Sequence, residues 1–463
     1  MSEIQDVWKP TRKHILNLIY FILSTIIVVA IWPHGEKEGL VRIIGIFIPV
    51  ASCYLVLWFF LAHFRGEVLD VTRKTLFIIL MILSFVTLTR YAMMFADRNI
   101  LFLIPVVIIP VVIRTFYDAR LALFILLITL MLSGFMVPDP FMYIFMSFIS
   151  GMIAIFTLRN IYRRAKLLIT AGTVVISYSI LYLGLSLMHD GSLINVRLSA
   201  FYLFAGNGLL VLISYPILFI FEKRFLFLSD TTLLELADTN QPLLRKLADE
   251  APGSFQHSLQ VANLAEEAAR VTGANLLLVR TGALYHDIGK IANPNYYIEN
   301  QVDESSPHDK LEPEESAKVI INHVKNGVIL AKNFKLPVQI IDFIRTHHGT
   351  TVAYYFFKKY TDRYPWDTSK EKEFTYPGPK PFSKETAVIM MADAVEASSR
   401  SLVKYSEESI SELVERIVYL QEQDGQFSDV PLTFKDISDI KSAFKRRLSN
   451  IYHIRIAYPE RET

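Results

Sequence analysis

Eight long apolar segments fill the first half of the chain, and they constrain its fold more than any other feature. Each is close to the length of about 17 to 25 residues that a helix needs to cross a bilayer. The segments lie at about residues 15–32, 40–63, 75–95, 99–114, 120–137, 140–158, 167–188 and 198–221. After residue 221 the composition is that of a soluble protein. The sequence therefore predicts an all-α protein, in which a polytopic helical membrane domain of about eight spans precedes a soluble helical domain.

The composition excludes several classes of protein. Hydrophobic residues make up 52% of the chain, and 47 lysines and arginines against 45 aspartates and glutamates leave a net charge of +2. So balanced a charge does not favour a nucleic-acid polymer as the partner. The single cysteine, Cys53, lies in an apolar segment, which excludes an internal disulfide and every cysteine-rich metal site. Any metal in this chain is therefore expected to have histidine and carboxylate ligands.

The basic residues predict how the segments cross the bilayer. The first segment follows Arg12 and Lys13 without a small-residue cleavage site after it, so we expect an uncleaved anchor. Lysine and arginine gather in alternate loops, which places residues 1–14 in the cytoplasm and loops 33–40 and 138–140 outside. Eight spans return the chain to the cytoplasm. Both termini and the soluble domain are therefore expected on the cytoplasmic side of the cell membrane.

Two features of the spans bear on the role of the membrane domain. The fourth segment carries Pro105 and Pro110, so we expect it to be kinked or re-entrant. Charged residues within the spans are scarce, and Arg90 lies near a span end, where its side chain is expected to reach toward the interface. An anchor or sensor is therefore favoured over a channel or transporter.

The change in composition along the chain predicts six regions. They are a cytoplasmic N-terminus (1–14), a first anchor (15–32), a short outer loop (33–40), a seven-span membrane domain (41–221), a juxtamembrane connector (222–250) and a soluble domain (251–463). The connector has amphipathic leucine spacing interrupted by Pro242. Two interpretations of it stay open: it transmits a signal, or it simply packs onto the domain that follows.

Helix signals follow one another through the soluble domain. Ser254 is expected to cap the first helix and Gly273 to end it. Further helices are predicted at residues 276–286, 313–333, 337–348, 384–403 and 406–421. The stretch 361–383 is rich in Pro, Gly, Tyr and Asp and is predicted to be an irregular insert. Because strand signals are nearly absent, the domain is expected to be a helical bundle.

Histidines and aspartates in these helices form the chemical signal of the chain. His286 precedes Asp287 directly, His347 and His348 are adjacent, and Asp393 lies within the apolar run 388–395. Burying such a carboxylate is costly unless a cation or hydrogen bonds meet it. The candidate ligands are His257, His286, Asp287, His323, His347, His348 and Asp393. Seven such ligands suit iron, manganese or zinc better than calcium, and they exceed the needs of one ion, so two ions sharing a carboxylate are predicted.

Ordered motifs around these residues resemble a known family. They are His257-Ser258 with Val261-Ala262-Asn263-Leu264-Ala265-Glu266, Tyr285-His286-Asp287-Ile288-Gly289-Lys290, Glu299-Asn300-Gln301, Pro307-His308-Asp309, His347-His348-Gly349-Thr350-Thr351 and Gly378-Pro379-Lys380-Pro381. A His-Asp pair alone is weak evidence, whereas six motifs in order behind a multi-span membrane half are strong. The chain resembles the HD-domain metal phosphohydrolases, and among them the PgpH-type seven-transmembrane phosphodiesterases, which hydrolyse cyclic di-AMP.

The resemblance implies a set of metal ligands and catalytic residues. One divalent transition-metal ion, iron or manganese, would be held by His257, His286, Asp287 and Asp393, and a second by Asp287, His323, His347 and His348. Asp287 would bridge the two ions, and together they would acidify a shared water. Lys290, one turn from Asp287, is the candidate to neutralise the phosphate. His308 is expected to be a loop residue outside the metal ligands.

Base selectivity is harder to predict from spacing. Tyr296, Tyr297 and the loop Gly378, Pro379 and Lys380 are candidates to stack on or close over a purine, with simple packing as the alternative. Unlike the HD-GYP enzymes, which act on cyclic di-GMP, the chain has no Gly-Tyr-Pro motif after His348, so the resemblance favours cyclic di-AMP. Two other interpretations stay open: a phosphodiesterase for another cyclic nucleotide or dinucleotide, and a catalytically silent membrane receptor that binds nucleotide or metal. A homodimer is possible on either account.

The chain departs from the family pattern in one place. Family members carry a large extracellular domain between the first two spans, whereas residues 33–40 leave room only for a short loop. This departure leaves the sensing of an outside ligand in question, but it does not touch the predicted catalytic residues.

Overall fold

The computed structural model describes residues 12–32, 39–95, 98–158, 164–194, 196–301, 306–365, 367 and 369–452. The chain divides into two compact units, one ending at Ser229 and the other beginning at Asp230. Most of the predicted cytoplasmic N-terminus and residues 33–38 of the predicted outer loop lie outside the described residues. Helices dominate both units, and the described residues contain no strand beyond one isolated bridge, between Val352 and Thr375. The predicted all-α fold class is confirmed.

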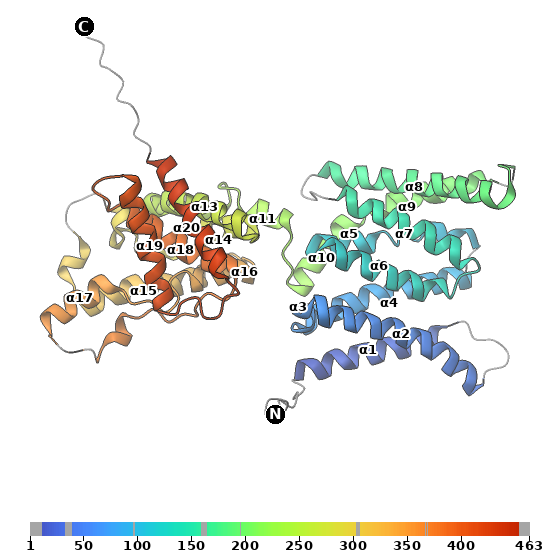
Figure 1. The fold of residues 1–463 in the computed structure, drawn as a ribbon, viewed down its shortest axis with the longest axis horizontal. Helices are drawn as coiled ribbons and strands as arrows, with labels where there is room; N and C mark the ends of the chain where they lie inside the picture. The colour runs from blue at the N-terminus through green and yellow to red at the C-terminus, as the bar shows by residue number, and fades with distance from the viewer. Residues whose placement is uncertain are drawn as a thin grey trace, which may run out of the picture. The chain divides into compact units, whose positions relative to one another are not determined.

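The first unit consists of apolar helices that run side by side (Figure 1). They are α1 (Arg12–Ile31), α2 (Leu40–Phe64), α3 (Gly66–Leu69), α4 (Thr72–Phe95), η1 (Arg98–Leu103), α5 (Ile108–Phe116), α6 (Ala119–Gly134), α7 (Pro140–Thr157), α8 (Arg164–Asp190), α9 (Leu198–Val211) and α10 (Ser214–Phe225). Among the described residues, six stretches are long and apolar enough to cross a membrane, with α9 and α10 counted as one. Two shorter apolar stretches, Ile100–Phe116 and Ala119–Gly134, correspond to the predicted fourth and fifth spans.

The predicted interruption of the fourth segment is confirmed. The short 3-10 helix η1 ends at Leu103, and α5 starts only at Ile108, so regular helical hydrogen bonding is lost between them and isolated turns remain. Asn207 of α9 is fully buried and compensates for part of this loss. Its Nδ2 donates to the carbonyl oxygens of Phe102 at 2.9 Å and Ile104 at 3.0 Å. Non-helical backbone in an apolar region needs partners of this kind.

The ends of the spans use polar side chains. Asp118 and Asp139 cap α6 and α7, each accepting a hydrogen bond from the backbone N–H three residues later. Arg90, expected near a span end, donates from Nε to the carbonyl oxygen of Ile31 at 2.9 Å, where α1 ends. Its charge therefore lies at the end of a helix, where unpaired carbonyl groups are available.

The second unit is a bundle of shorter helices with 3-10 turns between some of them. Its elements are α11 (Asp230–Leu236), α12 (Pro242–Glu250), α13 (Pro252–Thr272), α14 (Leu276–Tyr285), η2 (Ile288–Ala292), η3 (Pro294–Tyr296), η4 (Ile298–Asn300), η5 (Pro307–Lys310), α15 (Pro313–Asn333), α16 (Val338–Thr346), α17 (Tyr354–Arg363), η6 (Glu371–Phe374), α18 (Lys384–Ser399), α19 (Glu407–Gln423) and α20 (Phe434–Ile451). Helix α18 is buried along most of its length and packs against α13, α14, α16 and α19. It forms the centre of the bundle.

Several predicted helix ends agree with the structure, but the helix predicted at 384–403 already ends at Ser399, and the predicted start of α13 differs too. The helix predicted at 313–333 has those bounds, and Gly273 ends α13 with φ of +70°. Ser254 does not cap α13, because the helix begins at Pro252 and Ser254 already lies in its first turn. The N–H of Ser254 instead donates to Asn300 Oδ1 at 3.1 Å, from η4. The cap therefore comes from a distant segment, and the prediction for Ser254 was wrong.

Part of the predicted connector 222–250 packs onto the helical bundle. Helix α11 lies against α14, where Thr281 Oγ1 and Tyr285 OH donate to the carbonyl oxygens of Leu233 and Leu236. Helix α12 packs on α13 and η2. The compact unit thus starts at Asp230, and of the two interpretations of the connector, packing onto the domain is the one that these contacts favour.

Candidate metal centre

Seven candidate ligands, predicted from distant parts of the sequence, meet inside the second unit. His257 comes from α13, His286 and Asp287 from the end of α14, His323 from α15, His347 and His348 from the end of α16, and Asp393 from α18. Six of them are at most 6% exposed, and His348 is half-buried. Burial of so many polar side chains requires compensating partners.

Gly289 explains how two of these segments come close together. A Cβ atom on Gly289 would lie 1.8 Å from the carbonyl oxygen of His323, so only glycine allows η2 to lie against α15. Gly327 lies one turn after His323 on α15, and a Cβ atom there would lie 3.3 Å from the backbone nitrogen of Gly289. This close approach brings Asp287, just before η2, next to His323.

The ligand atoms fall into two groups with Asp287 between them. One group contains His257, His286 and Asp393, and the other contains His323, His347 and His348. Within the first group, His257 Nε2 lies 2.9 Å from Asp393 Oδ1, and His286 Nε2 lies 3.6 Å from the same oxygen. All ligand atoms of a group lie within 4.8 Å of one another, which is close enough to surround one ion.

Asp287 directs one oxygen toward each group. Its Oδ2 lies 3.2 Å from His286 Nε2, and its Oδ1 lies 3.4 Å from His323 Nε2 and 3.6 Å from His347 Nε2. Among the described residues, Asp287 Oδ1 and His286 Nε2 are buried without a hydrogen-bond partner. Buried polar atoms are rarely left in that state. A carboxylate placed between two ligand groups in this way is suited to bridge two cations.

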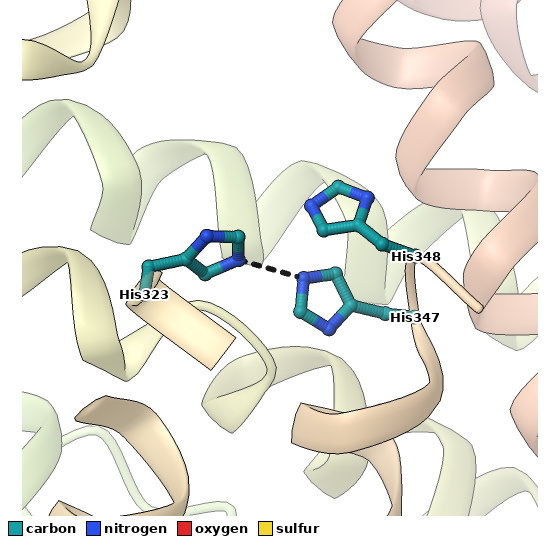
Figure 2. A group of neighbouring side chains, drawn as sticks. All are labelled: His323, His347 and His348. Carbon is teal, nitrogen blue, oxygen red and sulfur yellow. Dashed lines mark hydrogen bonds between the residues drawn. The ribbon is translucent and has the colours of Figure 1, made fainter. Parts of the chain in front are cut away.

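Figure 2 shows the all-histidine group, in which two ring nitrogens face each other. His323 Nε2 and His347 Nε2 are 3.0 Å apart. The Nδ1 atoms donate to backbone carbonyl oxygens, of Ile320 at 2.6 Å and Ile344 at 2.9 Å, so in the neutral rings both Nε2 atoms carry lone pairs. Two lone pairs need a positive charge between or beside them. The donor set therefore fits a bound divalent metal ion.

The electrostatics keep both kinds of ligand in their binding form. Burial opposes ionisation of Asp287, but the neighbouring His286 and Lys290 charges hold its pKa well below the usual value. Burial lowers the pKa of His348 to about 3 and holds that of His347 well below its usual value. His286 and His257 are exceptions: against the effect of burial, the Asp287 carboxylate raises the pKa of His286 to about 10, and the hydrogen bonds to Asp393 and Glu396 raise that of His257. A metal ion must displace these protons to bind.

A cavity of about 650 Å³ opens beside the ligands. His257, His347, His348 and Asp393 lie in its wall, together with Met390 and small residues of α18. Lys290 and Glu299 line it as well, and the Lys290 ammonium lies 2.8 Å from Asp287 Oδ2 and 2.7 Å from Glu299 Oε1. The Lys290 charge is thus already paired with two carboxylates, which raise its pKa against the effect of burial.

The residues suggested for purine contacts do not line this cavity. Tyr297 is buried, with its ring 6.0 Å from that of His323 and 5.0 Å from Lys290 Nζ. Tyr296 packs against His308, whose Nε2 bonds to the Tyr296 carbonyl oxygen, and His308 belongs to neither ligand group. In the loop Gly378, Pro379 and Lys380, the lysine Nζ donates to the carbonyl oxygen of Gly425. These contacts are of the packing kind.

Sequence reasoning missed side chains that support the ligands. Glu396 accepts a hydrogen bond from His257 Nδ1, and Tyr376 stacks on His348 with ring centroids 4.2 Å apart. Glu396 follows Asp393 by three residues in a helix, so its place on the same face was available as a signal. Tyr376 lies in the irregular insert, where no periodicity indicates which way a side chain points.

Comparisons with known proteins agree with this site. A family model described as a 7TM receptor with intracellular HD hydrolase matches residues 40–229, and one described as an HD domain matches residues 254–398. The chain is 34% identical over 447 residues to the cyclic-di-AMP phosphodiesterase PgpH of Bacillus subtilis, an alignment that covers 92% of this chain and 62% of that protein. It is 36% identical over 367 residues to PgpH of Listeria monocytogenes, covering 78% of this chain and 51% of that protein.

A solved structure is also similar. The HD domain of L. monocytogenes PgpH in complex with cyclic-di-AMP is 43% identical and covers 46% of this chain and 100% of that one, with a TM-score of 0.45. The chain thus spans roughly half to three-fifths of the length of the curated relatives it matches. The apolar helices and the matched family describe a multi-pass membrane protein with an HD domain that implies divalent-metal binding. The chain thus matches the model of 7TM receptors with an intracellular HD hydrolase in its first half and the HD-domain model in its second half, and it is similar to the PgpH proteins along most of its length.

Proposed function

We propose that the chain is a membrane-anchored phosphodiesterase that uses two divalent metal ions to hydrolyse cyclic di-AMP to the linear dinucleotide pApA. The convergence of seven histidine and aspartate ligands into two groups, with Asp287 between them and a cavity beside them, carries the proposal. His257, His286 and Asp393 would hold one ion, His323, His347 and His348 the other, and Asp287 both. Iron or manganese suits this set of imidazole and carboxylate ligands.

The charge of the site supports a substrate with two phosphates. Four carboxylates and two cationic side chains border the cavity or the ligands: Asp287, Asp393, Glu396 and Glu299, with Lys290 and Arg400. With the histidines neutral, as metal ligation requires, the net charge without metal is about −2. Two divalent ions would change it to about +2. A cyclic dinucleotide carries one negative charge on each of its two phosphodiesters, so its charge complements the metal-loaded site.

In the reaction we propose, a water oxygen forms a bond to phosphorus and the bond from phosphorus to the 3′ oxygen breaks. The 3′ oxygen leaves with a proton, and the phosphate stays on the 5′ oxygen, which gives pApA. Bound divalent ions acidify water and stabilise charge on the phosphoryl oxygens. Lys290 orients the Asp287 carboxylate through their 2.8 Å ion pair. The His323 and His347 rings are held in one tautomer by backbone carbonyls.

We also propose that both termini and the HD domain face the cytoplasm, where an intracellular nucleotide would reach the cavity. The alternation of basic residues between loops supports this orientation. The proposal also keeps the domain boundaries predicted from the sequence, with a membrane domain at residues 41–221 and a short outer loop at residues 33–40.

Kinetics on two substrates test the proposal. The detergent-solubilised chain, loaded with manganese, is given cyclic di-AMP or cyclic di-GMP, and products are separated by chromatography. We expect pApA from cyclic di-AMP with the higher kcat/KM. Faster cleavage of cyclic di-GMP would support the proposed phosphodiesterase activity but would contradict cyclic di-AMP as the preferred substrate. No cleavage of either by metal-loaded protein would favour a catalytically silent receptor.

A further inference from the structure

Glu396 occupies a position next to the metal ligands that no other described carboxylate shares. It lies on α18 one turn after Asp393, is 5% exposed, and accepts a hydrogen bond from His257 Nδ1. Its other oxygen, Oε1, accepts two bonds from Arg400, from Nε at 2.9 Å and Nη2 at 2.7 Å. Asp393 and Glu396 thus lie one turn apart on α18, and Arg400, directly after the helix ends, holds the Glu396 carboxylate.

Three of the other four histidine ligands have a different partner at Nδ1. His286, His323 and His347 each donate from Nδ1 to a backbone carbonyl oxygen three residues earlier in the chain. A carboxylate is a stronger acceptor than a carbonyl, and it makes the imidazole more basic at its metal-binding nitrogen. Among these four histidines, His257 alone has a carboxylate at this place.

The two ligand groups therefore differ in charge. The group His257, His286 and Asp393 contains a carboxylate and has Glu396 behind it, whereas the group His323, His347 and His348 contains histidines only. Asp287 lies between the groups and contributes to both. More negative charge and a more basic imidazole both favour a divalent cation.

We propose that Glu396 is a positioning residue that makes the His257 position the tighter of the two metal positions. By holding the His257 proton on Nδ1, Glu396 leaves Nε2 directed toward Asp393, 2.9 Å away. Arg400 keeps the Glu396 carboxylate in place. The two ions consequently bind one after the other, the first at the His257 position. This inference rests on the proposed use of two metal ions, but not on the identity of the substrate.

Metal binding to the full chain in detergent tests the proposal without any activity assay. The chain is stripped with chelator and titrated with Mn²⁺, and bound metal is measured by calorimetry and elemental analysis. For the unmodified chain we expect two steps that differ by about tenfold or more in affinity. Glu396→Gln should weaken the first step by about 10- to 100-fold, as loss of such a partner typically does, and leave the second unchanged.

A matched control removes a carboxylate elsewhere in the same domain. Glu266 of α13 pairs with Arg280 of α14 at 3.1 Å, and Glu266 belongs to neither ligand group. Glu266→Gln should leave both steps as they are. Arg400→Gln keeps all seven ligands and Glu396, so this variant tests the same proposal if Glu396→Gln fails to fold. Arg400→Gln should weaken the first binding step by a smaller factor than Glu396→Gln.

The outcomes separate the inference from the proposed function. Two steps of equal affinity in the unmodified chain, or equal weakening of both steps by Glu396→Gln or Arg400→Gln, would overturn the role of Glu396. Unchanged binding in these variants would overturn it too. Stepwise binding that responds as expected would stand even if the loaded protein cleaved no cyclic dinucleotide.

Discussion

At the scale of single residues, Asp287 is the side chain on which the proposed chemistry depends most. Its two oxygens lie toward different ligand groups, and Oδ1 is buried without a hydrogen-bond partner among the described residues. A carboxylate of this kind is stable only beside positive charge. Lys290 supplies part of that charge, and bound cations would supply the rest.

Replacing Asp287 with Ala is expected to remove the shared ligand of both ions. Metal content should fall below two ions per chain, and turnover should fall by at least about a thousandfold, because bound metal contributes several kcal/mol to transition-state stabilisation. Elemental analysis and product chromatography measure the two effects. Asp342→Asn is the control, since Asp342 pairs with Arg345 outside the ligand groups. Full activity of the Asp287→Ala protein would reject the bridging role.

Metal binding is also expected to release protons. Because the pKa of His286 is raised to about 10 without metal, its ring is protonated at pH 7 and must lose that proton to become a ligand. Apparent affinity should therefore rise with pH below about 10, by up to tenfold per unit for one displaced proton. Calorimetry of Mn²⁺ binding in buffers of different ionisation enthalpy gives the number of protons. A value of zero at pH 7 would contradict a raised pKa of His286 in the metal-free chain.

At the scale of elements, the close contact of η2 with α15 holds the two halves of the ligand set together. A Cβ atom at Gly289 would lie 1.8 Å from the carbonyl oxygen of His323. Gly289→Ala should therefore push η2 away and destabilise this part of the bundle by about 1 to 3 kcal/mol. Hydrogen exchange of α14 and α15 in the detergent-solubilised chain reports the loss.

A second glycine provides the control for this prediction. Gly273 has φ of +70° with open space around it, and asparagine tolerates that conformation. Gly273→Asn should therefore change exchange in α14 and α15 little. Equal protection in the Gly289→Ala and Gly273→Asn proteins would show that the close approach does not matter.

The elements also show which parts of the account could be predicted from sequence. Periodic patterns with proline or glycine at their ends were sufficient for α15 and for the end of α13 at Gly273. The cap of α13 was mispredicted, because Asn300 reaches Ser254 from a distant 3-10 turn. Helices α17 and α20 were not anticipated. Local patterns record capping and periodicity, but they do not record which distant segment supplies a partner.

In the candidate site, too, some residues could be predicted from the sequence and others could not. The seven ligands were named from motif spacing, and the structure brings them together. Tyr297 and Lys380 were suggested for purine contacts, yet Tyr297 packs beside His323 and Lys380 bonds to Gly425. Side-chain direction in irregular segments depends on tertiary packing, so spacing alone carries no information about it.

At the scale of the whole molecule, the apolar helices and the matched family place the first unit in a membrane, and the orientation is a prediction. Cysteines introduced at Gly35 or Asp139 in a chain with Cys53 replaced by serine should react with an impermeant reagent added to intact cells. A cysteine at Arg163 should not react, because basic loops face the cytoplasm. The reverse pattern would place the HD domain on the wrong side for an intracellular nucleotide.

Product analysis tests the central claim of metal-dependent phosphodiester hydrolysis most directly. The detergent-solubilised chain, shown by elemental analysis to hold two ions, is incubated with cyclic di-AMP, and the nucleotides are separated by chromatography. The account predicts that pApA appears, that chelator stops its formation, and that added manganese or iron restores it. Intact cyclic di-AMP after incubation with fully loaded protein, or pApA formation that chelator does not affect, would contradict it.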